Sequence, residues 1–484
     1  MTGYARQDRP SEANVVAQVV RHDVCVGCGI CAAVCPVNAL RIQFDPRGEL
    51  QPQLIGPCTQ CRKCLGVCPF GPDAGNDEDS LGRELLARQE GACHDNILGW
   101  YLTCLVGHVS DPRRRWSRSS GGLASWILGA LLERRLVDRV VCVIPNDDPQ
   151  QLFRFAVLDR PEQVWSAANS CYYPVEVSEA LRRVCQTPGR TAVVGLPCVL
   201  KGLRRWARMD GAWQERLAFA IGLACGGQRS KLYAEAVIRL LGLESAQVRR
   251  LQFRTKQPGV PAGQYAHSCS YLSEGPHERS ISHSKGPSRL WTSGCFRLNA
   301  CDYCDDIFAE LADVSLMDAW LDPYQADPAG TSLAVVRSTA ARKLLELGAA
   351  GRELVLSPIE AGQIIRSQSG VVRHKRDDLA ARLHLASRSR RAVPPKRVAG
   401  CAGTWAQRRR VAAAVRRVQY SKQAFLEYGA AGEGLSAFEA AMARMQRWDR
   451  LLAWALGRVS RLARFARRLG ASRRGLASSG RTSR

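Results

Sequence analysis

The chain has 484 residues and a formal net charge of +25, and its length predicts about three domains. No apolar run approaches the ~20 residues of a membrane-spanning helix, and the first residues lack the charged start and apolar core of a secretion signal. The 20 cysteines therefore indicate metal ligands and buried thiols rather than a disulfide framework. Because no nucleic-acid-binding motif accompanies the positive charge, we expect no nucleic-acid partner. The missing secretion signal and the use of the cysteines lead us to expect a cytoplasmic location.

Two cysteine runs with the same spacing occupy the N-terminal region. They are Cys25, Cys28, Cys31 and Cys35 before Pro36, and Cys58, Cys61, Cys64 and Cys68 before Pro69. Each run reads C-x2-C-x2-C-x3-C-P, the spacing that holds a 4Fe-4S cluster in bacterial ferredoxins, where the fourth cysteine serves the other cluster. We therefore predict one cluster on Cys25, Cys28, Cys31 and Cys68, and another on Cys58, Cys61, Cys64 and Cys35. The alternatives are disulfides or structural zinc, which usually takes two separated pairs of ligands.

The sequence predicts a small two-cluster ferredoxin-like domain over residues 15–75. Between the cysteine runs, residues 39–44 alternate as a strand does, and residues 45–48 form a turn signal. A glycine-containing, acidic stretch over residues 70–80 is typical of a linker.

An α/β body is predicted to follow, with regions 95–185 and 186–380, because helical and strand patterns alternate there. Strands are expected at 137–144, 190–196 and 217–225, and helices at 123–135, 197–206 and 230–241. Cys198 and Cys225 directly follow two of these strands, where sites in α/β bodies lie. With the C-x2-C pair Cys301 and Cys304 they could hold a third 4Fe-4S cluster. The alternative is that Cys198 and Cys225 are small buried apolar residues.

A candidate anion site opens the first helix of the body. Ser119, Ser120, Gly121 and Gly122 place hydroxyls and bare backbone amides at a helix N-terminus, which suits a pyrophosphate. The alternative is an ordinary capped helix, since serine is a favoured N-cap residue.

Several segments in chain order then resemble a known family. They are SSGGLASWILGALLERRLVDRVVCV, VVGLPCVLKGLRRW, IGLACGG, CDYCDDIFAELADVSLMDAWL and GTSLAVVRS. From about Leu98 to Arg376 the chain resembles the beta subunits of coenzyme F-420-reducing hydrogenases and dehydrogenases. The resemblance implies FAD near residues 119–122 and a 4Fe-4S cluster on Cys198, Cys225, Cys301 and Cys304.

Ser170 lies where the family has a Ser-Lys-Tyr-like segment, so the resemblance also implies a cofactor contact there. Two departures bear on the substrate. Cys171 stands where lysine is usual, and Met317 stands where the family generally has glycine, which would narrow the backbone approach to a ligand.

Residues 400–484 form a basic helical C-terminal region that holds more than half of the net charge. From residue 437 onward, apolar residues recur at three or four positions among arginines, which indicates an amphipathic helix. This helix could lie peripherally on an anionic inner membrane surface. It could instead pack on the body or on a partner.

The combined prediction is an α+β / α/β fold and an iron–sulfur flavoprotein oxidoreductase. It would pass electrons between three 4Fe-4S clusters and an FAD-linked two-electron substrate, which is a deazaflavin-like or other organic acceptor, and exchange electrons with a redox partner protein. The alternatives are a non-catalytic electron-transfer subunit and an accessory protein of envelope polysaccharide synthesis. Flavin content and turnover with a reduced dye separate the first two, and lipid flotation addresses the third.

Overall fold

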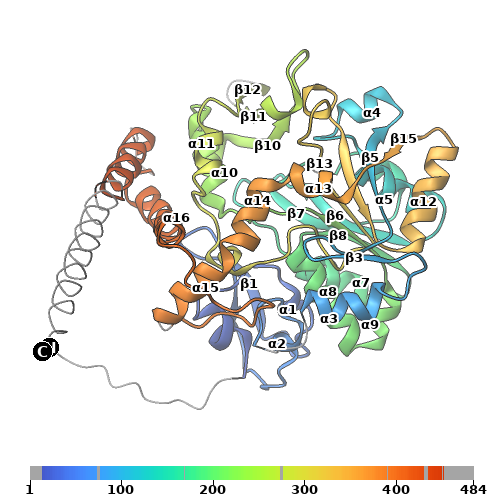
Figure 1. Cartoon of the computed structure of the whole chain (residues 1–484), viewed down its shortest axis with the longest axis horizontal. Helices are drawn as coiled ribbons and strands as arrows, with labels where there is room; N and C mark the ends of the chain where they lie inside the picture. The colour runs from blue at the N-terminus through green and yellow to red at the C-terminus, as the bar shows by residue number, and fades with distance from the viewer. Residues whose placement is uncertain are drawn as a thin grey trace, which may run out of the picture.

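The computed structural model describes residues 13–72, 77–167, 169–272, 276–389, 391–429, 434–449 and 451. It is a mixed helix and sheet protein built around one large sheet, which confirms the predicted fold class (Figure 1). Within these residues, no helix combines the length and apolar character needed to cross a membrane.

The N-terminal module is a hairpin between two short helices. Its elements are η1 (Val16–Val20), α1 (Ile30–Ala33), β1 (Leu40–Phe44), β2 (Leu50–Leu54) and α2 (Lys63–Val67). The strands pair antiparallel as the sequence predicts, and the Asp45 carboxylate closes the turn by accepting the amides of Arg47 and Glu49, each at 2.9 Å. The expected linker is partly helical, because Asp77 caps α3 (Glu78–Leu86) by accepting the Ser80 amide.

The body contains an eight-stranded mixed sheet in the order β15-β5-β14-β13-β9-β8-β6-β7. Its strands are β5 (Thr103–Val109), β6 (Arg139–Pro145), β7 (Phe153–Leu158), β8 (Thr191–Gly195), β9 (Leu217–Leu223), β13 (Val314–Asp318), β14 (Ser332–Val336) and β15 (Leu354–Pro358). The strand pairings make β5, β6, β8, β9 and β13 run in one direction, with β7, β14 and β15 reversed. The segments after β5, β8, β9 and β13 therefore meet at one edge of the sheet, here called the carboxyl edge.

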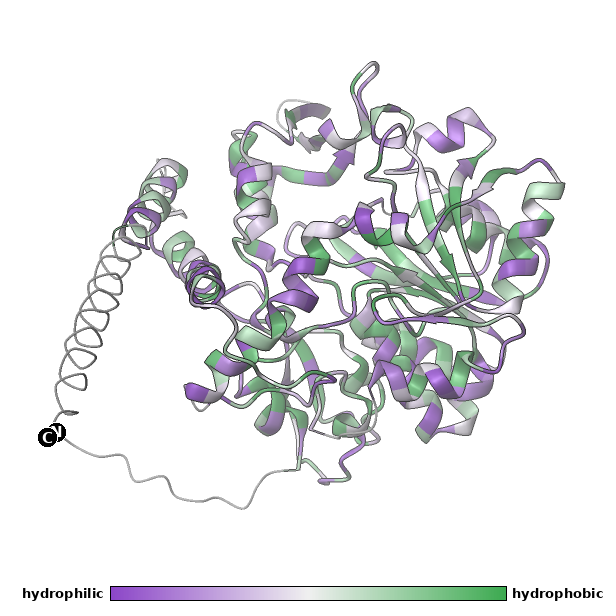
Figure 2. Ribbon diagram, in the orientation of Figure 1, coloured by the Kyte–Doolittle hydropathy of each residue, from purple (hydrophilic) through white to green (hydrophobic). Residues whose placement is uncertain are grey.

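Helices cover both faces of this sheet, because successive strand residues point to opposite sides. Val140 and Cys142 pack with α5 (Leu123–Glu133) and α12 (Thr339–Ala350), whereas Val141 packs with α7 (Ser178–Gln186), α8 (Pro197–Met209) and α9 (Gly211–Arg216). The N-terminal module joins the second layer through Ile30 and Val67 (Figures 1 and 2). It is therefore packed onto the body.

A smaller antiparallel sheet, β10-β11-β12, lies next to the carboxyl edge. It comprises β10 (Val248–Thr255), β11 (Ala266–Leu272) and β12 (Pro276–Ser282), flanked by α10 (Lys231–Leu240) and α11 (Pro287–Thr292). The Arg254 guanidinium at the end of β10 binds the Asp318 carboxylate at the end of β13, at 2.5 Å. This contact joins the two sheets.

The remaining elements are short connections and the C-terminal helices. They are β3 (Cys93–Asp95), β4 (Gly99–Tyr101), α4 (Pro112–Trp116), α6 (Pro161–Val164), η2 (Ser245–Gln247), η3 (Ala262–Gln264), η4 (Asn299–Tyr303), η5 (Tyr324–Ala326), α13 (Ala361–Ser367), α14 (Ser369–Val372), η6 (Arg373–Asp377), α15 (Leu379–Arg388), α16 (Trp405–Ala424) and η7 (Phe425–Gly429).

The described part of the basic C-terminal region packs on the rest of the molecule, although its charge suggested an appendage. Phe425 and Phe438 are fully buried against Phe296. The Lys422 ammonium, also buried, binds the Glu49 carboxylate of the N-terminal module. Apolar burial and a buried ion pair thus outweigh the regional charge. Most of the predicted amphipathic helix after residue 437 lies outside the described residues and stays a prediction.

We expect Lys422→Met to destabilise the protein by about 3 kcal/mol, because it removes the closer of the two cations beside the buried Glu49 carboxylate and leaves only Arg47, at 3.5 Å. Adding Glu49→Gln should restore part of that loss. Denaturant unfolding of both variants measures this. Arg289→Met, which breaks the surface pair with Glu439, is the control and should cost at most about 1 kcal/mol. A Lys422→Met loss no larger than the control would show that the C-terminal region does not secure the module.

Candidate metal and cofactor sites

Four thiols of the N-terminal module line one cavity. They are Cys25 and Cys28 from the loop that leads into α1, Cys31 from α1 itself, and Cys68 from the second cysteine run. Val24, Ile30 and Phe70 complete an apolar lining, and the Gly27 amide donates to Cys25 Sγ at 3.4 Å. The structure thus brings together the four residues that the cysteine spacing assigns to the first cluster.

A second cavity is lined by the other four thiols of the module. They are Cys35, Cys58, Cys61 and Cys64. The Gln60 amide donates to Cys58 Sγ at 3.4 Å, as Gly27 does in the first cavity. Cys61 is exposed, so this cavity opens to the surface.

The central thiols Cys198, Cys225, Cys301 and Cys304 also gather, although they come from three distant parts of the chain. Gln228 links two of them, because its amide donates to Cys301 Sγ at 3.3 Å and its side chain donates to Cys198 Sγ at 3.5 Å. The Gly227 amide lies 3.3 Å from Cys225 Sγ. Gly227 has a φ of +123°, and a Cβ there would meet Arg297 Cδ at 2.8 Å, so only glycine fits this turn.

A buried lysine adjoins the central thiols. The Lys375 ammonium donates to Cys304 Sγ at 3.2 Å and to the Asp306 carbonyl at 2.7 Å. The side chain is almost fully buried, and the neighbouring Cys304, Cys225 and Cys301 raise the pKa of Lys375 against the opposing effect of burial. A fixed positive charge therefore lies beside these sulfurs.

The three groups of thiols form one continuous series. Burial raises the pKa of Cys31, and nearby thiols, including Cys64 of the second cavity, raise this pKa further. Burial likewise raises the pKa of Cys198, with further contributions from the central thiols and from Cys28 of the first cavity. Cys28 and Cys198 belong to the same apolar cluster. The order through the interior is therefore second cavity, first cavity and central thiols.

The chemistry of these sites fits iron–sulfur clusters. Burial raises the pKa of Cys28 to about 12 and that of Cys68 to about 11, so their thiolates need positive charge, which cluster iron supplies. Within the described residues, no three His, Cys, Asp or Glu side chains converge as the ligands of a single ion would. The thiols of the module instead surround cavities.

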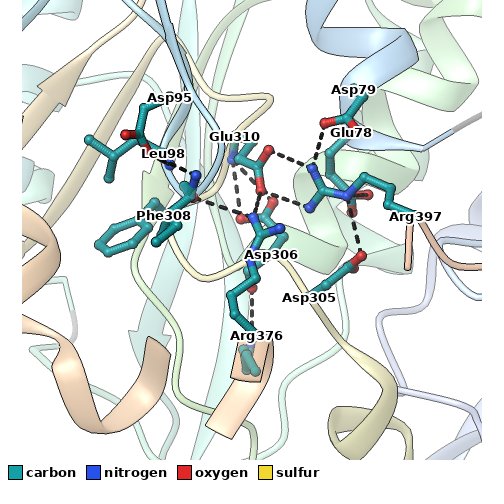
Figure 3. Close-up of polar contacts among 12 residues, drawn as sticks. Glu78, Asp79, Asp95, Leu98, Asp305, Asp306, Phe308, Glu310, Arg376 and Arg397 are labelled. Atoms are coloured by element: carbon teal, nitrogen blue, oxygen red, sulfur yellow. Dashed lines mark hydrogen bonds and ion pairs between the residues drawn. The ribbon is translucent and has the colours of Figure 1, made fainter. Parts of the chain in front are cut away.

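A network of buried ion pairs surrounds Arg397 and Glu310 and includes Asp305, the residue after Cys304 (Figure 3). The Arg397 guanidinium binds the carboxylates of Asp79 at 2.7 Å, Glu310 at 2.9 Å and Asp305 at 3.2 Å. Arg376 also binds Glu310, at 2.7 Å. Because Asp305 follows Cys304 directly, this network fixes the loop that carries the central C-x2-C pair.

The predicted flavin residues are brought together at the carboxyl edge, after β5, where they bond mainly to one another and to β14. The Ser119 hydroxyl accepts the Ser170 amide at 3.0 Å, and the Gly121 amide donates to the Ser332 hydroxyl at 3.0 Å. A Cβ on Gly121 would lie 2.6 Å from the Gly107 carbonyl oxygen. Its missing side chain thus allows close packing against the sheet rather than against a ligand.

The N-terminus of α5 retains features of an anion site. Among the described residues no side chain caps this helix, whose N-cap Gly122 has a φ of 86°, so its first-turn amides lack a capping partner. The Arg118 guanidinium reaches Ser125 in that turn, at 3.5 Å. Lys256 donates to the carbonyl oxygens of Arg115, at 2.8 Å, and of Ser120, at 2.9 Å, which fixes the loop in place.

Sequence reasoning missed a cluster of titratable side chains on the small sheet. His267 Nε2 lies 3.0 Å from His283 Nδ1, and the His283 ring stacks on Tyr265 with centroids 4.5 Å apart. The Arg254 guanidinium lies 4.8 Å above the Tyr265 ring. These residues lie on the neighbouring strands and turns of the small sheet and share no motif. Only their tertiary placement beside Asp318 links them to the carboxyl edge.

The fold and the grouped thiols together define an iron–sulfur protein of an oxidoreductase class. Residues 104–182 match the N-terminal part, and residues 189–362 the C-terminal part, of the family described as the coenzyme F-420 hydrogenase/dehydrogenase beta subunit. Residues 24–72 match the 4Fe-4S dicluster domain. The chain belongs to the coenzyme F-420 hydrogenase/dehydrogenase beta-subunit family and carries an N-terminal dicluster domain.

Two curated proteins are similar over part of their length. A subunit of the F(420)H(2) dehydrogenase of Methanosarcina mazei is 26% identical over 219 residues, which are 43% of this chain and 55% of that protein. An uncharacterized ferredoxin of Methanocaldococcus jannaschii is 35% identical over 51 residues, which are 10% of this chain and 66% of that protein. The chain thus spans about half and about two thirds of these relatives.

Among solved structures, a chain of the F-420-reducing NiFe hydrogenase complex of Methanosarcina barkeri, studied as a xenon derivative, is 17% identical with a TM-score of 0.45. The matched region covers 60% of this chain and 96% of the hydrogenase chain.

The histidine pair should make stability fall in mild acid. Burial lowers the pKa of His267 to about 3 and that of His283 to about 4, whereas the unfolded residues titrate near about 6.5. Below that pH the unfolded state binds more protons, so stability decreases as pH falls from about 6.5 towards about 4.

The variant His267→Gln should reduce this acid loss by about 1–2 kcal/mol between pH 6.5 and pH 5. Urea unfolding at both pH values measures the effect. The matched change His94→Gln, at an exposed position, should leave the pH dependence unaltered. Equal slopes in the wild type and His267→Gln would contradict the prediction.

Proposed function

We propose that this protein is an iron–sulfur flavoprotein oxidoreductase that passes electrons between three 4Fe-4S clusters and an FAD-linked two-electron substrate, which is a deazaflavin-like or other organic acceptor. The observation that carries the proposal is the continuous series of three thiol groups. The central group lies at the carboxyl edge, where the loops of the predicted flavin residues also lie. When bound, the clusters would carry single electrons, and FAD would exchange one with them and two with the substrate.

The proposed cluster ligands are those assigned from the sequence. Cys25, Cys28, Cys31 and Cys68 would hold the first cluster, Cys58, Cys61, Cys64 and Cys35 the second, and Cys198, Cys225, Cys301 and Cys304 the third. The apolar lining from Val24, Ile30 and Phe70 excludes water from the first cavity. Beside the third group, the Lys375 ammonium and the amide of Gln228 stabilise negative charge on sulfur.

For FAD, we propose that the pyrophosphate lies at the N-terminus of α5, near residues 119–122 and Ser170. The family membership supports this placement, as do the uncapped first turn of α5 and the nearby Arg118 guanidinium. The guanidinium of Arg254 on β10 and the carboxylate of Asp318 on β13 join the small sheet to the carboxyl edge, and we propose that they orient an organic ring there.

Replacing Cys301 and Cys304 by serine should remove one cluster, so that iron falls from about twelve to about eight per chain. Anaerobic purification, iron analysis and low-temperature EPR measure the loss. Cys295→Ser is the control, because Cys295 contacts Ser293 at 3.3 Å in a different apolar cluster, and it should keep its iron. An unchanged iron content in the double variant would refute the third cluster.

Ser170→Asp should abolish flavin retention, because a carboxylate beside Ser119 repels the pyrophosphate. The protein with Ser170→Asn should retain its flavin, because asparagine has nearly the same shape as aspartate but no charge. The measurement is FAD per chain after acid extraction, with iron content as the check of folding. Equal flavin in both variants would place the phosphates elsewhere.

A further inference from the structure

The second cavity of the N-terminal module has an open, apolar rim. Of the twelve candidate ligand thiols, only Cys61 is exposed, and Cys58 beside it is half-buried. Val37 and Leu54 line this cavity. They are 47% and 40% exposed, and the next residue, Ile55, is 50% exposed. Isolated exposed apolar residues are common, but a group around one opening is typical of a binding surface.

Among the described residues of the module, the charge around this rim has one sign. Residues 24–44 and 50–72 contain no aspartate or glutamate. Arg62 lines the cavity, and the exposed Lys63 begins α2 beside it. The acidic residues of the intervening turn are engaged elsewhere, since Asp45 binds Arg47 and Glu49 binds Lys422. The rim is therefore basic around an apolar centre.

We propose that this rim, formed by Val37, Leu54, Ile55, Arg62 and Lys63, docks an electron-transfer protein with an acidic face around its own one-electron carrier. The proposal rests on the proposed function, since it takes the second cavity as a cluster site. Apolar contact at the centre brings the two carriers close, and opposite charges at the edge speed encounter. One electron passes between the carriers, with no bond made or broken and no proton moved.

The test uses the full-length protein with its clusters oxidised and an acidic two-cluster ferredoxin, chemically reduced beforehand, as the probe. Stopped-flow absorbance under anaerobic conditions gives the second-order rate of electron transfer at low and high salt. The rim variants are Ile55→Glu, and Arg62→Asn combined with Lys63→Glu. Asparagine is chosen because Arg62 has a φ of 62°, which asparagine tolerates.

Matched controls lie on and just after α12, away from α2 (Figure 1). Leu347→Glu repeats the apolar-to-acidic change at a residue that is 57% exposed. Arg352→Asn combined with Lys343→Glu repeats the charge change, since Arg352 has a φ of 58° and both residues are exposed. These controls separate docking at the rim from general attraction to a chain of net charge +25.

We expect each rim variant to slow electron transfer at low salt by about tenfold or more, and the charge variant to lose most of its salt dependence. The control variants should stay near the wild type, and reduction by a small neutral dye should be unchanged throughout. Equal electron-transfer rates in the rim and control variants would overturn the docking surface. It would also be overturned if the rim variants kept the wild-type transfer rate and instead changed the sedimentation, and so the oligomeric state, of the free protein. A wild type that shows no cluster EPR signals after chemical reduction would overturn the proposed function itself.

Discussion

The ion pairs around Arg397 hold the molecule together at the point where three distant segments meet. This guanidinium binds Asp79 of α3, Asp305 next to Cys304, and Glu310 before β13. Such a buried group is stable only when all partners are present, because a lone buried charge is costly. The network therefore fixes α3, the central thiol loop and the segment around Arg397 in one arrangement. It holds in place the loop that carries Cys301 and Cys304.

The pairing of buried charges also explains why a strongly basic chain folds compactly. Five of its buried cations lie beside a carboxylate or a thiol, namely Lys201, Lys375, Lys396, Arg397 and Lys422. The buried guanidiniums of Arg229 and Arg337 donate instead to backbone carbonyl oxygens. Thiols that carry negative charge when they bind iron add to the anions available inside. The positive charge of the C-terminal region thus partly balances buried negative charge, as Lys422 does beside Glu49, and partly lies on the surface.

The three thiol groups differ in their exposure to solvent and in their position in the fold. The second cavity opens to the surface, the first is enclosed between the module and α8, and the central group lies where strands β8 and β9 end. Electrons entering at an exposed point would reach a site shielded from water, which suits chemistry on an organic ring. The carboxyl edge is where α/β bodies generally bind ligands.

The sequence by itself determined the two cysteine runs and the strands β8 and β9 that precede Cys198 and Cys225, and it predicted the shared assignment of the fourth cysteines. These are local patterns, in which spacing and hydrophobic period dictate geometry. Tertiary structure alone decided that Lys375 contacts Cys304 and that Lys422 reaches Glu49, because these partners are far apart in the chain and have no spacing to signal them. The pairing of β11 with β12 decided that His267 meets His283. It also decided that Gly121 packs against Gly107. Long-range packing and buried charge pairing, rather than local propensity, control those positions.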